Sequence, residues 1–168
     1  MKKITDLKCM YPTKEYVAIG VYYSKEHMAV DLCWNSKYGG KNQPIVAPYD
    51  GKVVAIKDHD KTNKSWGNYV KIDIGKFQCK YRVKRAYILV AHLEEGIKVK
   101  VGQKVKMGDL LGHMGNTGRS FGNHTHYEFY LGGASTKYRV DPEKYTYVYP
   151  KQKVSSNKSA TKGLKYIK

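Results

Sequence analysis

Residues 122–130, GNHTHYEFY, contain two histidines separated by one threonine within a run of aromatic and β-branched residues. Successive side chains of a β-strand point to opposite faces, so His124 and His126 should share one face, with Glu128 next in the same row. Two aligned imidazoles indicate a shared site for metal binding or proton transfer. A lone His-x-His is a weak signal, so this interpretation depends on further partners elsewhere in the chain.

A second pair of candidate ligands lies upstream in HMAVD, where His27 and Asp31 are four residues apart at the entry to an apolar segment. The even spacing again predicts one face of a strand. Imidazole nitrogen and carboxylate oxygen together suit zinc, and catalytic zinc sites have three protein ligands plus water. Structural zinc sites usually close with a fourth ligand, often cysteine, and the chain has no CxxC pair. The residue types therefore favour an open site.

Three further histidines have to be weighed. His92 ends the apolar segment YILVAHL, and the pattern of residues leaves its role open. His59 lies in the polar loop DHDKTNK and His113 in LLGHMGN, where neither has other candidate ligands beside it. We interpret both as ordinary turn or surface residues.

The elements that must position these residues are strands between closely spaced turns. Segments rich in Val, Ile and Tyr alternate with glycine-containing turns and show no helical stripe; they are GKVVAI, NYVKIDI, YILVAHL and HYEFYL. This pattern predicts an all-β domain. The chain has 168 residues, of which 41% are hydrophobic, as expected for one globular domain with a substantial core.

The remaining composition limits the class of protein. No run of eighteen apolar residues occurs, and the basic start MKKITDLKCMYPTK lacks the apolar core of a secretory signal, so we expect no membrane insertion and no signal peptide in this chain. The three cysteines, Cys9, Cys33 and Cys79, form no CxxC and leave an odd one over. We interpret them as small apolar filler rather than as a disulfide framework.

The net charge of +17 indicates an anionic partner, such as nucleic acid, acidic lipid or an anionic wall polymer. Residues 151–168 carry six lysines and no acid, which is typical of a linker or mobile basic extension. We therefore expect a folded domain at residues 1–149 and a basic tail at residues 150–168. Removing the six lysines from the 31 basic residues leaves 25 against 14 acidic residues, a net charge of +11, so the domain itself is basic.

The order of three motifs carries a resemblance to a known family. HMAVD, then VAHL, then GNTGRSFGNHTHYEF resembles the lysostaphin-like zinc endopeptidases of bacterial peptidoglycan, whose signatures are H-x-x-x-D, A-H-L and a final H-x-H after a G-x-T-G-x-S turn. APYDGKVVA, WGNYVKIDI and VKVGQKVKMGDLLGHMG also match, so the resemblance covers roughly residues 20–130. The chain departs from the family pattern at Val90, Asn123 and Thr125, and residues 75–87 are longer and more basic than the usual connection.

The resemblance implies the fold and the role of each site residue. It implies the duplicated hybrid motif fold, with antiparallel β-sheets forming a groove whose walls are loops. His27, Asp31 and His126 would bind one zinc ion per chain, whereas His92 and His124 would act on the substrate as catalytic residues. Glu128 would hydrogen-bond a ligand ring as a supporting residue. Spacing alone does not distinguish His124 from His126.

The implied activity is that of a cell-wall lytic zinc metalloendopeptidase, which cleaves a cross-bridge or stem peptide of peptidoglycan. The expected partners are this peptide substrate and anionic cell-wall polymers, with no nucleic acid, and the chain is expected to be a monomer. Its place of action is the bacterial cell wall, as a phage-encoded endolysin, a virion-associated module or a fragment of a larger protein.

Three alternatives compete with this interpretation. A catalytically inactive wall-binding module of the same fold would have lost a ligand, and all five histidine and aspartate positions are present. A basic nucleic-acid-binding β-domain would suit +17 and sixteen tyrosines, yet leaves the ordered motifs unexplained. A biotinyl or lipoyl carrier domain needs a lysine at the tip of a tight turn, and Lys106 in VKMGD is not in the matching place.

Overall fold

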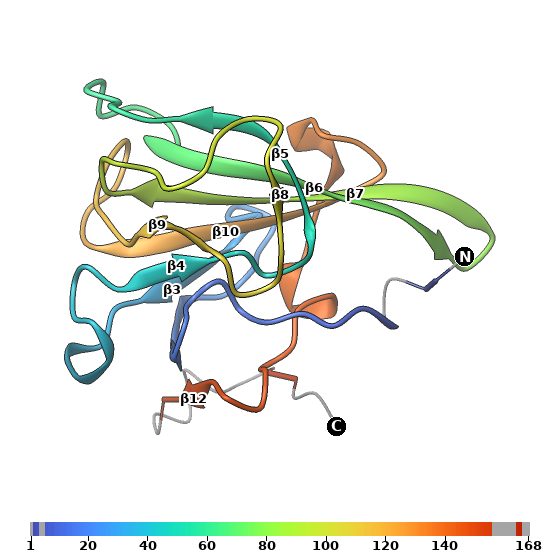
Figure 1. Cartoon of the computed structure of the whole chain (residues 1–168), viewed down its shortest axis with the longest axis horizontal. Coiled ribbons are helices and arrows are strands. Elements are labelled where there is room, and N and C mark those ends of the chain that lie inside the picture. The colour runs from blue at the N-terminus through green and yellow to red at the C-terminus, as the bar shows by residue number, and fades with distance from the viewer. Residues whose placement is uncertain (1, 4–5, 156–163, 166–168) are drawn as a thin grey trace.

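The computed structural model describes residues 2–3, 6–155 and 164–165, and its regular structure consists almost entirely of β-strands (Figure 1). The strands are β1 (Tyr16–Val17), β2 (Ile19–Val21), β3 (Val30–Cys33), β4 (Pro44–Val46), β5 (Gly51–Lys57), β6 (Asn68–Cys79), β7 (Arg82–Leu93), β8 (Lys104–Val105), β9 (Leu110–His113), β10 (His124–Leu131), β11 (Arg139–Val140) and β12 (Lys153–Val154). The short 3-10 helices are η2 (Ser36–Tyr38), η3 (Thr136–Tyr138) and η4 (Pro142–Lys144). Within these described ranges, no helix combines the length and apolar character needed to cross a bilayer. The predicted all-β class is confirmed.

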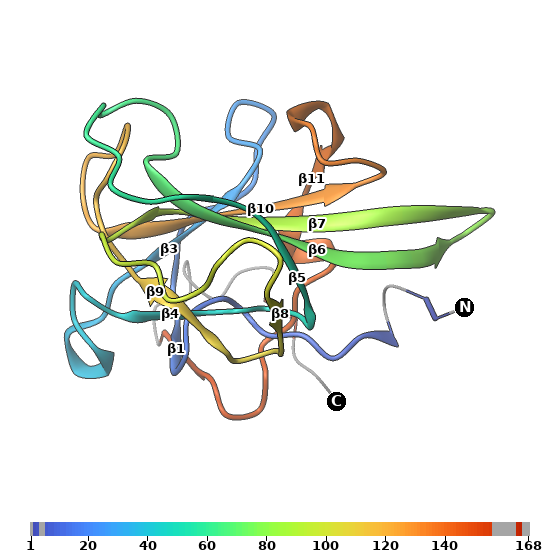
Figure 2. The same cartoon turned by 45° about the horizontal axis from the view of Figure 1, so that its top comes forward.

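One large antiparallel sheet contains eight strands in the order β2-β3-β10-β7-β6-β5-β8, with β11 also paired to β10. β10 therefore lies inside the sheet, hydrogen-bonded to β3 on one side and to β7 on the other. A second, two-stranded sheet of β4 and β9 lies beneath the large sheet in Figure 2. The strands beside β10 are distant from it in the sequence. Its position in the sheet therefore depends on contacts between separate segments of the chain.

The main core lies between these two sheets. Tyr127 and Phe129 of β10 are fully buried there, together with Ile45 of β4 and Leu111 of β9. Because side chains alternate along a strand, the other residues of β10 must point to the opposite face. That face carries both histidines of GNHTH, so core packing of the odd-numbered residues fixes the direction of the even-numbered ones.

The hairpin of β6 and β7 is the longest element of the fold. Its two 12-residue strands stay paired to Cys79↔Arg82, and the turn uses Lys80 with a left-handed φ of 48°. The pairing of β5 with β6 ends at Asp73 and that of β10 with β7 ends at Ala86. The outer half of the hairpin therefore extends past the rest of the sheet, at the right of Figure 1. Residues 75–87, interpreted from sequence as a connection, form this outer half.

The described residues just beyond Pro150 pack against the domain. β12 pairs in parallel with β1, and Gln152 is buried, with 7% of its surface exposed. Its Nε2 donates hydrogen bonds to the carbonyls of Tyr11 (2.9 Å) and Thr13 (2.6 Å), and its Oε1 accepts from the backbone N–H of Tyr11 (3.2 Å) and Tyr149 (3.0 Å). The expected boundary between residues 1–149 and 150–168 stays a prediction, because residues 156–163 and 166–168 lie outside the described ranges.

The cysteines differ in burial. Cys9 is buried in the core, as expected, whereas Cys33 and Cys79 are partly exposed, and all three are free thiols. The structure thus agrees with the expected absence of a disulfide framework among these three residues.

We expect Gln152→Ala to destabilise the folded state. Removing the side-chain amide leaves buried N–H and carbonyl groups of two separate segments without partners, at a cost of about 1–3 kcal/mol for each group that water does not reach. The free energy of unfolding should fall by roughly 2–4 kcal/mol, with a melting temperature lower by about 5–10 °C. Thermal or urea unfolding measures the change. The exposed neighbour Lys151→Ala is the matched control, and equal melting temperatures for the two variants would contradict the prediction.

Candidate metal centre and active site

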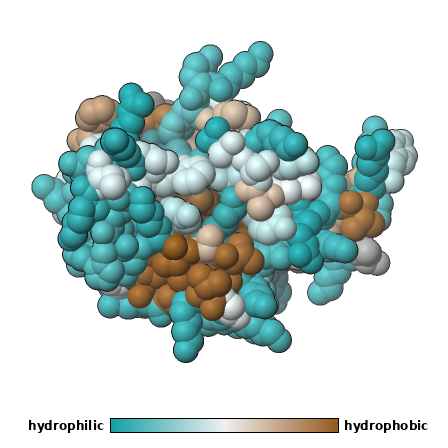
Figure 3. All heavy atoms as spheres, turned by 90° about the horizontal axis from the view of Figure 1, so that it is seen from above, coloured by the Kyte–Doolittle hydropathy of each residue, from teal (hydrophilic) through white to brown (hydrophobic). Residues whose placement is uncertain are grey.

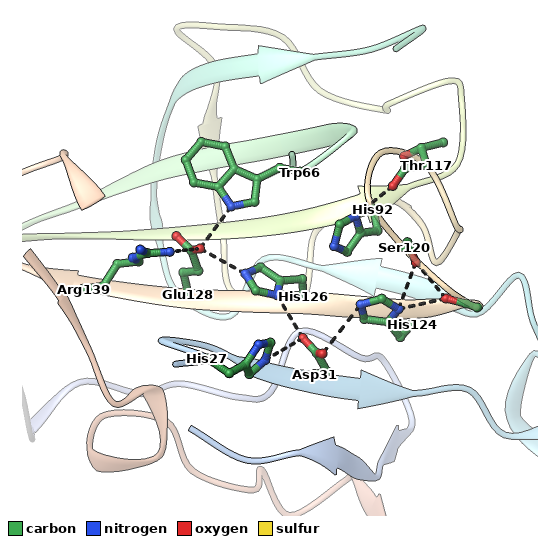
Figure 4. A network of polar contacts seen from close by, with 11 residues as sticks. His27, Asp31, Trp66, His92, Thr117, Ser120, His124, His126, Glu128 and Arg139 are labelled. Atoms are coloured by element: carbon green, nitrogen blue, oxygen red, sulfur yellow. Dashed lines mark hydrogen bonds and ion pairs between the residues drawn. The ribbon is translucent and has the colours of Figure 1, made fainter. Parts of the chain in front are cut away.

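Two neighbouring strands and one turn bring His27, Asp31 and His126 together (Figure 4). Asp31 of β3 lies directly opposite His126 of β10 in the antiparallel register, because β3 and β10 are adjacent in the sheet. One ligand atom from each of the three residues lies within 4.8 Å of the others. This is the group of metal-binding side chains expected from the sequence.

His27 reaches this group from a turn and not from a strand. β3 begins at Val30, and the backbone N–H of His27 donates a 2.9 Å hydrogen bond to the Ser24 hydroxyl in the preceding turn. The backbone N–H of Ser24 donates in return to the carbonyl of His27 at 2.9 Å. The prediction that His27 and Asp31 lie together is therefore correct, but its premise, that both lie on one face of a strand, is wrong.

The Asp31 carboxylate is the centre of the cluster. Its Oδ1 lies 3.1 Å from His27 Nε2 and 2.9 Å from His126 Nδ1, while its Oδ2 lies 3.7 Å from His124 Nε2. Burial alone would raise the pKa of Asp31, but the hydrogen bond with His126 and the three nearby imidazoles outweigh burial and lower it. Asp31 is thus a carboxylate at neutral pH.

The donor atoms fit a divalent cation. His27 Nε2 is buried and forms no hydrogen bond within the described part of the chain, although it lies close to Asp31. A buried nitrogen lone pair without a donor is costly unless a cation or a proton satisfies it. Two imidazoles and one carboxylate are ligands that zinc accepts in a three-residue site with an open position.

His126 is fixed between two carboxylates. Its Nε2 lies 3.0 Å from Glu128 Oε1, which leaves Nδ1 to face Asp31 and His27. Burial would lower the pKa of His126, but the hydrogen bonds with Asp31 and Glu128 more than offset it and raise the pKa to about 9. Without a metal the ring is therefore protonated at pH 7, and a metal bound at Nδ1 would displace the proton there while Glu128 keeps the proton on Nε2.

Glu128 is completely buried, yet it is fully paired. Besides His126, its carboxylate accepts hydrogen bonds from Trp66 Nε1 (3.0 Å), Arg139 (3.0 Å) and the Tyr130 hydroxyl. Burial alone would raise the pKa of Glu128, but the hydrogen bonds with His126 and Tyr130 and the charges of His126 and Arg139 outweigh burial and lower it, so the group is ionised. Its position supports the expectation that it orients a ligand ring.

We expect Glu128→Gln to weaken metal binding by about 10- to 100-fold, the usual effect of losing a carboxylate behind a ligand imidazole. The amide keeps the shape but removes the charge that fixes the His126 ring. Competition with a chromophoric chelator measures the affinity. Glu94→Gln, at an exposed position, is the control and should bind metal normally. An affinity equal to that of the parent chain would show that Glu128 serves packing alone.

His92 is positioned by a β-bulge. In the pairing of β6 with β7, Tyr69 lies opposite Ala91 and Asn68 opposite Leu93, so His92 is the extra residue. It has a left-handed φ of 61°, which is rare for a residue other than glycine, and its backbone N–H donates to the carbonyl of Trp66 at 2.9 Å. The bulge turns this side chain toward the histidines of β10, with ring centroids 4.8 Å from His124 and 5.5 Å from His126.

His92 and His124 are tethered in the same way. Nδ1 of His92 lies 2.8 Å from the carbonyl of Thr117, and Nδ1 of His124 lies 2.8 Å from the carbonyl of Gly122. A carbonyl can only accept, so each Nδ1 carries a proton, and in the neutral form of each ring Nε2 keeps its lone pair. Burial, the largest effect, lowers the pKa of His92 to about 4, so this imidazole is neutral at pH 7. Two imidazoles can therefore accept or relay protons beside the metal-binding group.

These residues line an open hollow of about 720 Å³ on the sheet. Its walls include Trp66 from the β5–β6 loop, Arg119 and Phe121 from the β9–β10 loop, and Arg139 from β11. Phe121 is 97% exposed. The expected groove, with a sheet as its floor and loops as its walls, is confirmed.

The sequence analysis did not identify Trp66 or Arg139. Trp66 in the β5–β6 loop and Arg139 in β11 both donate hydrogen bonds to the Glu128 carboxylate. The other two histidines lie outside the group: His59 is exposed and hydrogen-bonded to Glu95, and His113 pairs with Pro44 in the small sheet. Neither lines the hollow, in agreement with their interpretation as ordinary residues.

An antiparallel sheet that carries a His–Asp–His group beside two further imidazoles in an open groove is the arrangement of a metal-dependent hydrolase. The chain belongs to Peptidase family M23, whose model matches residues 26–142. The resemblance to lysostaphin-like proteins is thereby confirmed.

Individual relatives agree with this assignment. The chain is 38% identical over 91 residues to peptidoglycan DD-endopeptidase ShyA of Vibrio cholerae, which covers 54% of this chain and 18% of that protein. It is 40% identical over 88 residues to an uncharacterized metalloprotease of Buchnera aphidicola, with 52% and 20% covered. The chain thus spans about a fifth of the length of these curated relatives.

Solved structures match over more of their length. The catalytic domain of the prophage-encoded M23 protein EnpA from Enterococcus faecalis gives a TM-score of 0.56 at 26% identity, with 80% of this chain and 90% of that chain covered. The catalytic domain of the antimicrobial peptidase lysostaphin from Staphylococcus simulans gives 0.53 at 25% identity, with 84% and 93% covered.

Proposed function

We propose that this chain is a zinc-dependent endopeptidase that cleaves peptide bonds in bacterial peptidoglycan. The observation that carries the proposal is the joint arrangement of His27, Asp31 and His126 with two imidazoles whose Nε2 atoms are free of hydrogen bonds within the described residues. The family, and relatives named as peptidoglycan endopeptidases, supply the substrate class.

In this proposal, His27, Asp31 and His126 would hold one zinc ion, which would supply Lewis acidity and lower the pKa of a water molecule toward ~7. Asp31 contributes the negative charge of the site, and Glu128 keeps the His126 ring in one orientation. Loss of either carboxylate would therefore change how the metal is held.

His92 and His124 handle the protons. Each presents Nε2 as a base because its Nδ1 proton is held by a backbone carbonyl. A neutral imidazole can accept a proton from attacking water, and the imidazolium so formed can stabilise a nearby oxyanion or protonate the leaving amine. The two rings lie side by side, with centroids 4.8 Å apart, so one bound peptide could be within reach of both.

We also propose where the protein acts. Residues 1–149 would be the catalytic domain and residues 150–168 a basic extension, with the bacterial cell wall as the place of action. A phage-encoded endolysin or a virion-associated module is supported by the similarity to a prophage-encoded catalytic domain of nearly the same extent.

The proposal is tested on purified peptidoglycan of defined cross-bridge type. We expect peptide fragments with new amino termini, identified by mass spectrometry, and about one zinc per chain by elemental analysis. Treatment with a chelator should abolish cleavage, and added zinc should restore it. Activity that persists in a metal-free preparation would contradict the zinc dependence. About one zinc with no cleavage of any wall would instead identify a binding module of the same fold.

A further inference from the structure

The outer half of the β6–β7 hairpin is strongly basic. Residues 74–86 include Lys76, Lys80, Arg82, Lys84 and Arg85 and no acidic residue. Of these five cations, only Arg85 forms an ion pair with another described residue, Asp73, at 3.0 Å. The other cations of this segment are therefore not neutralised by the described part of the protein and keep their attraction for an external anion.

The cations gather around a hollow of about 800 Å³. Lys80, Arg82 and Lys84 line it from the hairpin, and Lys3 lines it from the N-terminal segment, which is bridged to β6 at Lys3↔Gln78. None of the described lining residues is acidic. Cys79 and Arg82 are paired, and Arg82 and Lys84 lie two residues apart, so these side chains share one face of the hairpin.

An aromatic residue completes this surface. Tyr81 at the hairpin turn is 84% exposed, and Lys80 Nζ lies 4.9 Å from the centroid of its ring. Figure 3 shows the projecting end of the molecule at the right as mainly hydrophilic spheres around a small hydrophobic area. An exposed ring beside cations suits a ligand that has both apolar carbon surface and negative charge.

We propose that this surface, lined by Lys3, Lys80, Tyr81, Arg82 and Lys84, binds an anionic polymer with repeated phosphodiester groups. Residues two apart in a strand are ~6.7 Å apart, so Arg82 and Lys84 can each contact a separate phosphate of an extended polymer. Arginine suits this role because its planar guanidinium binds phosphate through two hydrogen bonds. The choice of a wall-attached polymer over nucleic acid rests on the proposed function. The inference that the ligand is an anion rests on the charges of the surface alone.

This surface is separate from the catalytic groove. Arg82 and His92 are at opposite ends of β7, ten residues and ~34 Å apart along an extended strand. Binding at the hairpin would hold the enzyme on the wall while leaving the groove free for the peptide. Hydrolysis of a short soluble peptide should therefore not depend on these cations.

The test uses the full chain with Lys80→Gln, Arg82→Gln and Lys84→Gln combined. The matched control combines Lys98→Gln, Lys100→Gln and Lys104→Gln, which removes the same charge from exposed positions elsewhere. Binding to purified walls is measured by brief pelleting at several salt concentrations. We expect the hairpin variant to bind at least ~10-fold more weakly than the control at low salt, with a salt dependence that is lower by about one unit of slope per lost phosphate contact.

Three comparisons decide the outcome. On walls chemically stripped of phosphate polymers, the difference between the hairpin variant and the control should disappear, and its persistence would overturn the proposal. Equal loss of binding in both variants would show that charge acts diffusely and would also overturn it. The proposal would also be overturned if the hairpin variant lost affinity for a single-stranded oligonucleotide while its wall binding was unchanged.

Folding and catalysis are monitored separately. A charge-conserving variant, with Lys80→Arg, Arg82→Lys and Lys84→Arg, should keep most of the wall binding, and an unchanged melting temperature of the glutamine variant would exclude misfolding as the cause of its loss. Hydrolysis of a short soluble peptide should be unchanged in the hairpin variant. If no variant or parent chain hydrolyses any peptide but the binding difference remains, the proposed function fails and the polymer site stands.

Discussion

His126→Ala is expected to lose metal and activity together. The substitution removes one of three protein ligands and leaves Asp31 and Glu128 facing an empty volume where the ring had separated them. Zinc affinity should fall by about three orders of magnitude or more, and peptidoglycan cleavage should fall to the background rate at stoichiometric zinc. Elemental analysis after gel filtration gives the stoichiometry, and release of wall fragments gives the activity.

Excess zinc separates metal loss from misfolding. If His27 and Asp31 persist as ligands, a large excess of zinc should restore part of the activity of His126→Ala, and the circular dichroism spectrum should match that of the parent chain. A variant that keeps about one zinc per chain after gel filtration would refute the assignment of His126 as a ligand. If His124→Ala lost zinc instead, the roles of the two histidines in the GNHTH strand would be reversed.

His92→Asn and His124→Ala should fail differently, with loss of turnover but not of metal. Both should retain about one zinc and lose on the order of 10²–10⁴ in kcat, the usual contribution of a general acid or base. Asparagine is chosen at position 92 because His92 has a left-handed φ, which asparagine tolerates better than alanine does. The substitution thus removes the imidazole while it preserves the bulge.

His59 offers a matched control for this substitution. It has a left-handed φ of 59° but is exposed and lies outside the groove. His59→Asn should therefore be near the parent chain in zinc content, melting temperature and turnover, as should His113→Ala. Full activity in His92→Asn would remove His92 from the mechanism and leave His124 to act alone.

The alternation of side chains along a strand predicted those neighbours in the site that belong to one strand. It placed His124, His126 and Glu128 on one face of a strand, and the structure has them on the face of β10 opposite the core. The resemblance added His92 and the grouping of His27, Asp31 and His126, which spacing could not supply. The structure brings these residues together, whereas their catalytic and ligand roles stay predictions.

Long-range contacts were beyond the sequence pattern. The hydrogen bond between Trp66 and Glu128 joins residues 62 positions apart, and nothing local to either marks it. The bulge that turns His92 inward depends on the register of β6 with β7. The lysine-rich composition near Gln152 gave no sign that this amide is buried by a partner segment about 140 residues earlier in the chain. Each of these features is set by strand pairing across the fold.

The central place of β10 also affects how the protein exchanges hydrogen with solvent. β10 pairs with β3 over residues 124–127 and with β7 over residues 126–131, so its hydrogen-bonded amides become accessible only when one of these strands separates from it. Such openings are cooperative and approach the global unfolding free energy, unlike the fraying of an edge strand. Deuterium uptake should therefore be slowest in the same strand that carries His124 and His126. The spacing of these imidazoles would then persist for as long as the sheet remains closed, through any motion of the surrounding loops.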